Sequence, residues 1–222
     1  MPRREAFGKT CLKIAVVDYG MGNLRSVSKA IEHVAPQARV LVTSDPEEVA
    51  RAERVVVPGQ GAMPDCMREL EARGLRAAVI DAARDKPYLG ICIGLQMLFE
   101  SSEEGDAKGL GVLKGTVRRF PQGLAEPATG VRLKVPHIGW NQVHQSRVHA
   151  LWREIPDAGR FYFVHSYYPD EGEPALRSGT AEYGMAFTCA VARDNIFAVQ
   201  FHPEKSQSAG LQLLSNFVHW RP

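Results

Sequence analysis

The chain has 222 residues, a formal net charge of +2 at pH 7 and an aromatic content of 8%. A chain of this length can bury one sizeable core, and no change of composition divides it, so we predict a single domain over residues 1–222. The near-neutral charge, without a dense basic run interleaved with aromatic residues, argues against a nucleic-acid-binding protein.

Residues 1–12 are rich in charge and lack the apolar stretch of a signal peptide, so we interpret them as a flexible N-terminal extension. No stretch approaches the ~20 apolar residues of a membrane-spanning helix. The four cysteines show neither C-x-x-C spacing nor paired histidines, which indicates no zinc site and no disulfide framework. We therefore expect a cytoplasmic, reduced protein with no membrane attachment, no metal and no cofactor.

The first hundred residues alternate apolar runs with amphipathic stretches, a pattern typical of β-α units. Strands are expected at 13–18, 39–42, 54–57 and 88–92, and helices at 23–34, 45–48, 64–72 and 75–84. Right-handed crossovers between such units give a parallel sheet.

From Gly115 onward the pattern changes to closely spaced strand-like runs that turn-forming residues separate. These runs are 116–120, 137–143, 160–168, 179–183, 186–192 and 196–201. Such spacing predicts antiparallel strands beside the parallel core. A last helix over 208–220 should bury Leu211, Leu214, Phe217 and Val218. The predicted fold class is thus α/β, a central mostly parallel sheet flanked by helices, with additional antiparallel strands in the C-terminal half.

The strand at 88–92 ends in the turn Gly90-Ile91-Cys92-Ile93-Gly94. The two glycines remove Cβ atoms that would clash where a strand turns sharply into a helix, so Cys92 can be pushed out at the apex. At a helix N-terminus the free N–H groups favour a thiolate, and the N–H of Ile93 can face an oxyanion. The alternative is a small buried cysteine at a strand–helix junction with no chemistry.

A base and its orienting acid are found in the segment Gln200-Phe201-His202-Pro203-Glu204. On an extended backbone, side chains two apart share a face, so Glu204 can bond one ring nitrogen of His202 while the other faces a thiol. A partly buried strand-end histidine is the alternative for His202. Cys92, His202 and Glu204 together supply nucleophile, base and orienting group.

Glycines also flank the end of the strand at 54–57, in Pro58-Gly59-Gln60-Gly61. Such a segment lets substrate approach the backbone and can supply a second oxyanion donor, although a plain tight turn is the alternative. Gly20-Met21-Gly22 lacks the third glycine of a dinucleotide-binding fingerprint, so the sequence gives little support to nucleotide binding.

These motifs together resemble the class I, triad-type glutamine amidotransferases over nearly the whole chain. The segment at 57–61, the turn around Cys92 and the segment at 200–205 carry the resemblance. The stretches 136–143 and 161–168, with support from 18–24, resemble the branch of that family that serves histidine biosynthesis. Gln60 departs from the valine common at its position, and Ile93-Gly94-Leu95 departs from leucine-glycine-methionine, but both keep the backbone roles.

The resemblance implies a glutaminase that forms a thioester on Cys92 and releases glutamate and ammonia. It also implies that Gln96 binds the polar end of glutamine, while Gly61, Ser166 and Tyr167 line the pocket. Gly59, Gln60, Gly61 and Ile93 would form the oxyanion site, which in this family is often misoriented until a partner activates the enzyme.

The resemblance further implies a heterodimer in which the ammonia passes to a separate (β/α)₈-barrel cyclase subunit. That subunit would make imidazole glycerol phosphate and an aminoimidazole carboxamide nucleotide. Trp140 is then a candidate interface or gate residue, with a core tryptophan as the alternative. Two other functions stay open at this point: a glutaminase for another pathway, such as anthranilate or pyridoxal phosphate synthesis, and a non-catalytic scaffold of the same fold.

Overall fold

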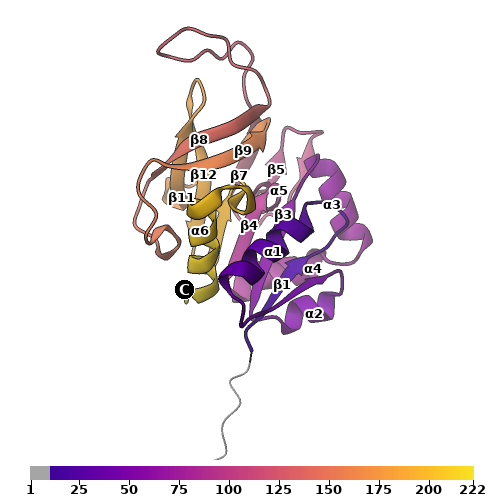
Figure 1. Cartoon of the computed structure of the whole chain (residues 1–222). Helices are drawn as coiled ribbons and strands as arrows, with labels where there is room; N and C mark the ends of the chain where they lie inside the picture. The colour runs from indigo at the N-terminus through magenta and orange to yellow at the C-terminus, as the bar shows by residue number, and fades with distance from the viewer. Residues whose placement is uncertain (1–10) are drawn as a thin grey trace, which may run out of the picture.

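The computed structural model of the protein describes residues 11–222 (Figure 1). The predicted N-terminal extension lies outside these residues, except for its last two positions. Leu12 packs against the core, and its carbonyl oxygen accepts a hydrogen bond of 2.8 Å from the backbone N–H of Arg39. The folded part of the chain therefore includes Leu12.

A nine-stranded sheet forms the centre of the described structure, in the order β2-β1-β3-β4-β13-β12-β11-β8-β9. Its strands are β1 (Lys13–Val17), β2 (Arg39–Thr43), β3 (Arg54–Gly59), β4 (Tyr88–Cys92), β8 (His137–Gln145), β9 (Gly159–His165), β11 (Arg177–Glu182), β12 (Ala186–Arg193) and β13 (Ile196–Val199). The first five strands in this order run parallel and the others antiparallel. This confirms the predicted α/β class, with antiparallel strands added from the C-terminal half.

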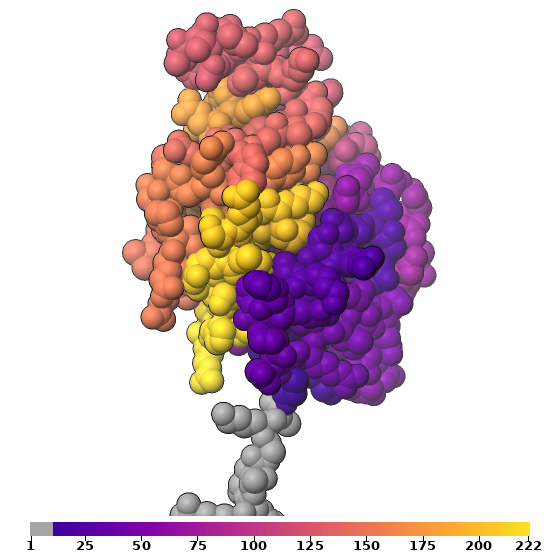
Figure 2. Space-filling view, viewed as in Figure 1, coloured from indigo at the N-terminus to yellow at the C-terminus, as the bar shows by residue number. Residues whose placement is uncertain are grey.

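Helices cover both faces of the parallel part. They are α1 (Leu24–Val34), α2 (Pro46–Arg51), α3 (Met63–Ala72), α4 (Arg76–Asp85), the single turn α5 (Ile93–Gln96) and α6 (Gln207–His219). The chain steps one way along the sheet from β1 to β2 and the other way from β3 to β4, so right-handed crossovers place α1 opposite α3 and α4. The C-terminal α6 lies beside α1, as the yellow and indigo surfaces in Figure 2 show.

A second, four-stranded sheet has the order β10-β7-β5-β6. Its strands are β5 (Ser101–Ser102), β6 (Ala107–Lys108), β7 (Gly115–Arg119) and β10 (Tyr167–Glu171). The prediction of one continuous strand over 160–168 was therefore wrong: β9 ends at His165, and the chain crosses at Ser166 into the second sheet as β10. Aromatic residues continue through the break, so residue type could not reveal it.

The inward face of α6 differs from the predicted one at a single position. Leu214, Phe217 and Val218 are buried as expected, but Leu213 is buried in place of Leu211, which is only half-buried. The reason is Gly210, where a Cβ atom would lie 1.9 Å from the carbonyl oxygen of Pro203. The helix turns its glycine toward the short 3-10 turn η3 (Pro203–Lys205), and this close approach sets its rotation.

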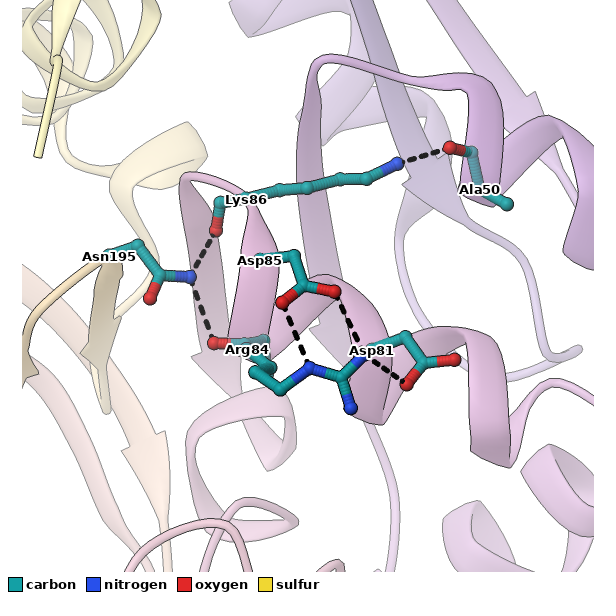
Figure 3. Close-up of polar contacts among 7 residues, drawn as sticks. Ala50, Asp81, Arg84, Asp85, Lys86 and Asn195 are labelled. Carbon is teal, nitrogen blue, oxygen red and sulfur yellow. Dashed lines mark hydrogen bonds and ion pairs between the residues drawn. The ribbon is translucent and has the colours of Figure 1, made fainter.

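Lys86 and Asn195 tie the N-terminal ends of β4 and β13 to the neighbouring helices (Figure 3). The Lys86 ammonium donates to the carbonyl oxygens of Ala50, Val49 (3.1 Å) and Ala52 (2.8 Å) at the C-terminal end of α2. The Asn195 amide donates to the carbonyl oxygens of Ala83 (2.9 Å) and Lys86 (2.5 Å). A single cation thus donates to three carbonyl groups at the end of a helix, where such groups lack a full set of backbone partners.

Lys86→Met should lower the free energy of unfolding by about 1–2 kcal/mol, because the apolar stem is kept while the carbonyl groups lose a charged donor. Urea denaturation checks this as a lower midpoint with an unchanged m-value. Arg84→Met is the matched control. Among the described residues the exposed Arg84 guanidinium pairs with Asp81 and Asp85, and such surface pairs contribute little, so its loss should leave the midpoint where it is. Equal midpoints for Lys86→Met and wild type would contradict the role given to the ammonium.

Candidate active site

The register of three parallel strands brings the predicted catalytic residues to one edge of the sheet. Gly59 at the end of β3 pairs with Cys92 at the end of β4. Val199 at the end of β13 pairs with Ile91, so the chain that leads to His202 leaves the sheet beside Cys92. Residues from distant parts of the sequence therefore meet at the carboxyl ends of the strands, where α/β sheets usually hold their ligands.

Cys92 has the backbone conformation of a strained turn, with φ 56° and ψ −109°. The two glycines around it have no room for side chains. A Cβ atom on Gly94 would lie 1.8 Å from the carbonyl oxygen of Val57, and one on Gly90 would lie 2.6 Å from the carbonyl oxygen of Gly94. The predicted turn thus has its expected steric cause. Because α5 is only one turn long, its first N–H groups, rather than a long helix dipole, are what it offers to an anion.

His202 and Glu204 are both buried, and their side chains are joined by a contact of 2.8 Å between Nδ1 and Oε1. A carboxylate only accepts, so the proton lies on Nδ1. The other ring nitrogen, Nε2, is buried and has no hydrogen-bond partner within residues 11–222. It is the nitrogen left for the thiol of Cys92, which is close enough to influence its protonation.

Electrostatics at His202 favour the imidazolium when the cysteine is charged. Burial by itself lowers the pKa of His202, but the contact with Cys92 and the hydrogen bond to Glu204 outweigh it and raise the pKa to about 10. The backbone holds the ring in place through a hydrogen bond of 2.9 Å from the N–H of His202 to the carbonyl oxygen of Tyr162. The arrangement is suited to a thiolate–imidazolium pair.

A cavity of about 310 Å³ opens in front of the thiol. Its lining is Gln60, Gly61, Cys92, Ile93, Gln96, Glu104, Pro136, Val164, His165, Ser166, Tyr167 and His202. It brings together the predicted nucleophile, base and pocket residues. Three predicted residues lie outside the lining: Gly59, which pairs with Cys92 in the sheet, Glu204, which bonds the Nδ1 side of His202, and Trp140.

The predicted oxyanion segment is tightly packed from behind. A Cβ atom on Gly59 would lie 2.4 Å from the hydroxyl oxygen of Tyr19 and 2.6 Å from the Cβ atom of Ile93. The Tyr19 hydroxyl donates to the carbonyl oxygen of Pro58 at 2.8 Å. The Cys66 thiol lies 3.5 Å from the carbonyl oxygen of Gln60. Gly61 has φ +102°, a conformation that favours glycine. The oxyanion role of this segment stays a prediction.

Trp140 lies apart from the cavity. Its side chain is 38% exposed on β8, and its neighbour on the same face, Ile138, is 59% exposed. The alternative of a core tryptophan is therefore wrong, and the interface role remains a prediction.

Sequence reasoning missed Gln200 as a site residue. Its amide nitrogen lies 3.7 Å from the Cys92 sulfur, and its amide oxygen accepts from Gln96 Nε2 at 3.1 Å. The Gln96 amide also donates to the carbonyl oxygen of Tyr167 at 3.3 Å, which leaves its own oxygen buried and without a partner in the described chain. Gln200 lies just beyond the end of β13, and its contact with Cys92 depends on the pairing of β13 with β4, which no local signal in the sequence specifies.

Two further properties concern the described chain as a whole. Within residues 11–222, no group of three or more histidine, cysteine, aspartate and glutamate side chains is placed to hold a metal ion. Over the same range, no helix has both the length and the apolar character needed to cross a membrane.

Comparison with known proteins gives a consistent result. Residues 15–220 match the family described as glutamine amidotransferase class-I. The chain is 66% identical to imidazole glycerol phosphate synthase subunit HisH of Nitrosospira multiformis, over 94% of this chain and 98% of that one. It is 67% identical to the subunit HisH of Dechloromonas aromatica, over 94% of this chain and 97% of that one. In fold it is similar to PurLQS from Thermotoga maritima, with a TM-score of 0.69, 17% identity and coverage of 94% and 98%.

The buried histidines should make the protein less stable in acid. Burial lowers the pKa of His137 and of His149 from 6.5 to about 4 and that of His165 to about 3. Because the unfolded chain binds these protons more readily, their contribution is full above about pH 6.5 and declines as the pH falls below that value. It is completely lost once the pH has passed the folded-state values of about 4 and 3.

Urea denaturation at several pH values in this window measures the effect. Each histidine can contribute a slope of at most about 1.4 kcal/mol per pH unit. His137→Phe should therefore show a shallower fall of stability between about pH 6.5 and pH 4 than wild type. Parallel curves for the two proteins would show that His137 is not held neutral by the fold.

Proposed function

The chain belongs to the glutamine amidotransferase class-I family and, within it, to the HisH subunits of imidazole glycerol phosphate synthase, and from this premise we propose that it hydrolyses glutamine on Cys92 and passes the ammonia to a separate cyclase subunit. One observation supports the chemistry above all others. A cysteine on a strained turn faces a cavity of about 310 Å³ together with a buried histidine whose other nitrogen bonds a buried carboxylate. This is the arrangement of an activated nucleophile.

The reaction is an acyl transfer in two stages. The Cys92 thiolate attacks the side-chain amide carbon of glutamine, and the His202 imidazolium protonates the departing nitrogen, which leaves as ammonia. The neutral His202 then takes a proton from water, and the resulting hydroxide attacks the thioester. Collapse of the tetrahedral intermediate that this attack forms releases glutamate and restores the thiolate–imidazolium pair. Glu204 keeps the imidazole in the required tautomer throughout.

In both stages negative charge develops on the oxygen that belonged to the side-chain amide of glutamine, and this charge needs hydrogen-bond donors. We assign this role to the backbone N–H groups of Ile93 and of the Gly59-Gln60-Gly61 segment, since Ile93, Gln60 and Gly61 line the cavity. Loss of one such donor typically costs about 2.7–4 kcal/mol of transition-state stabilisation. The orientation of this segment is therefore an effective control point for the rate.

The polar end of glutamine is assigned to the part of the cavity that Gln96 lines. The Gln96 amide oxygen is buried and unpaired within the described residues, so it can accept from the ammonium group of the substrate. The backbone of Gly61, Ser166 and Tyr167 completes this part of the lining. An amino acid bound here would satisfy a buried acceptor that the protein alone leaves without a donor.

We assign the cyclase partner the fold of a (β/α)₈ barrel. The two chains would form a heterodimer in the cytoplasm. The relatives at 66% and 67% identity are named as subunits of imidazole glycerol phosphate synthase, which favours this partner over those of the anthranilate and pyridoxal phosphate pathways. The juxtaposition of Cys92, His202 and Glu204 argues against a non-catalytic scaffold. Exposed Ile138 and Trp140 on β8 are candidate contact residues.

A glutamine-like electrophile such as a diazo-ketone should alkylate Cys92 selectively. Cys66 and Cys189 are fully buried, and burial raises the pKa of both thiols, that of Cys66 to about 11. Cys11 is exposed and does not line the cavity in front of the Cys92 thiol. Peptide mapping by mass spectrometry checks the site, and iodoacetamide, which does not resemble glutamine, serves as a control that should label Cys11. Label from the diazo-ketone mainly on Cys11, Cys66 or Cys189 would refute the assignment.

Cys92→Ala should abolish glutamine-dependent formation of imidazole glycerol phosphate in the complex with the cyclase. With ammonium at alkaline pH, where more of it is NH₃, the same complex should keep its activity, because the substitution leaves the docking surface intact. Wild-type chain alone should hydrolyse glutamine slowly and accelerate when the cyclase and its ligand are added. High glutaminase activity that the cyclase does not change would contradict the assigned partner.

A further inference from the structure

His137 and His165 form a buried pair where β8 and β9 meet. The two residues are directly opposite in the antiparallel register, and His137 Nδ1 lies 3.0 Å from His165 Nε2. Both belong to the stretches, 136–143 and 161–168, that point to this branch of the family. The triad uses neither of them. Their placement beside the glutamine cavity therefore calls for a function of their own.

The partners of the pair fix the direction of each hydrogen bond. His165 Nδ1 lies 2.8 Å from the carbonyl oxygen of Tyr167, which can only accept, so this nitrogen carries the proton of the neutral ring. His165 Nε2 is then an acceptor, and His137 Nδ1 must donate to it. His137 Nε2 faces the amide nitrogen of Asn141 at 3.4 Å. The Asn141 amide is oriented by a bond of 2.7 Å to the carbonyl oxygen of Glu182.

The chain of bonds ends at the substrate-binding residues. The Tyr167 carbonyl oxygen accepts from His165 and also from Gln96 Nε2, at 3.3 Å. Its position therefore determines both the Ser166-Tyr167 backbone and the amide of Gln96. A run of aligned donors thus extends from Asn141 on β8 through two rings to the residues that line the glutamine cavity.

The rings are held so that this chain can persist. His137 is stacked between Phe163 and Tyr183, with ring centroids 4.9 Å and 4.1 Å away and interplanar angles of 24° and 25°. The pair also separates two cavities. His165 lines the glutamine cavity, whereas His137 and Asn141 line a second one of about 340 Å³ beside Trp140. That second cavity lies beneath the loop between β7 and β8, which projects from the molecule in Figure 1.

We propose that His137 is a positioning residue for glutamine binding, acting through His165 on the Tyr167 carbonyl and the Gln96 amide. The proposal rests on the proposed glutaminase function and adds a link from β8 to the substrate pocket. His137 provides the cleaner test, because His165 lines the glutamine cavity and His137 does not. Removal of its donor should loosen the pocket without touching the reacting atoms.

The test uses the whole chain in complex with the wild-type cyclase. The substitution His137→Phe keeps the stacked ring and removes both nitrogens. It should raise the KM for glutamine roughly tenfold, the equivalent of one hydrogen bond to a binding group, and change kcat by less than about twofold. His137→Asn, which returns a donor near the position of Nδ1, should recover most of this loss. His149→Phe removes a partly buried histidine whose Nδ1 accepts from the N–H of Leu151, so the KM of this variant for glutamine should stay at the wild-type value.

Ammonium-dependent synthase activity should be the same in all four complexes, which shows that folding and docking are intact. An inactive wild-type complex would refute the proposed function itself. With an active wild type, an unchanged KM in His137→Phe, or no recovery in His137→Asn, would overturn the positioning role alone.

The tautomers give a second, independent test on the wild-type protein. Nitrogen NMR spectra of the histidine-labelled chain should show His137 and His165 both protonated on Nδ1 near neutral pH. His137→Phe should leave the Nδ1 proton of His165 in place, because the Tyr167 carbonyl still requires it. A proton on Nε2 of either ring in the wild-type protein would reverse the hydrogen bonds and refute the chain.

Discussion

The position of the Cys92 thiol depends on the close approach of α5 to the end of β3. A Cβ atom on Gly94 would overlap the carbonyl oxygen of Val57 at 1.8 Å, and one on Gly59 would meet the Cβ atom of Ile93 at 2.6 Å. No side chain fits at either glycine. The contact presses the first turn of α5 onto the sheet, and Cys92 adopts a positive φ at the junction. Strain of this kind costs on the order of 1–3 kcal/mol and is held only by a well-packed surrounding.

Unpaired buried polar atoms concentrate at the same place. Within residues 11–222, six buried side-chain atoms have no hydrogen-bond partner, and three of them belong to Gln96, His202 and Glu204. Each such atom costs roughly 1–3 kcal/mol in a folded protein. A site that binds a polar substrate needs groups of this kind, because bonds already made inside the protein are not available to the ligand. The buried aromatic and aliphatic core around β3, β4 and β13 offsets that cost.

The division of the chain between two sheets at Ser166 joins the pocket to the rest of the molecule. β9 belongs to the central sheet and β10 to the second one, and the two residues at the crossing, Ser166 and Tyr167, line the cavity in front of Cys92. A change in the packing of either sheet would therefore move the Ser166-Tyr167 backbone. The hydrogen bond from His165 to the Tyr167 carbonyl spans this crossing and limits that movement.

The sequence by itself determined the α/β class, the sharp turn at Cys92 and the pairing of His202 with Glu204, because each depends on residues close together in the chain. Glycine spacing, hydrophobic periodicity and the two-residue repeat of a strand are local signals. The tertiary structure alone decided the break at Ser166, the rotation of α6 about Gly210, the contact of Gln200 with Cys92 and the pairing of His137 with His165. These features depend on strand register and on contacts between segments distant in sequence, and no local pattern of residue types specifies which distant group will lie opposite.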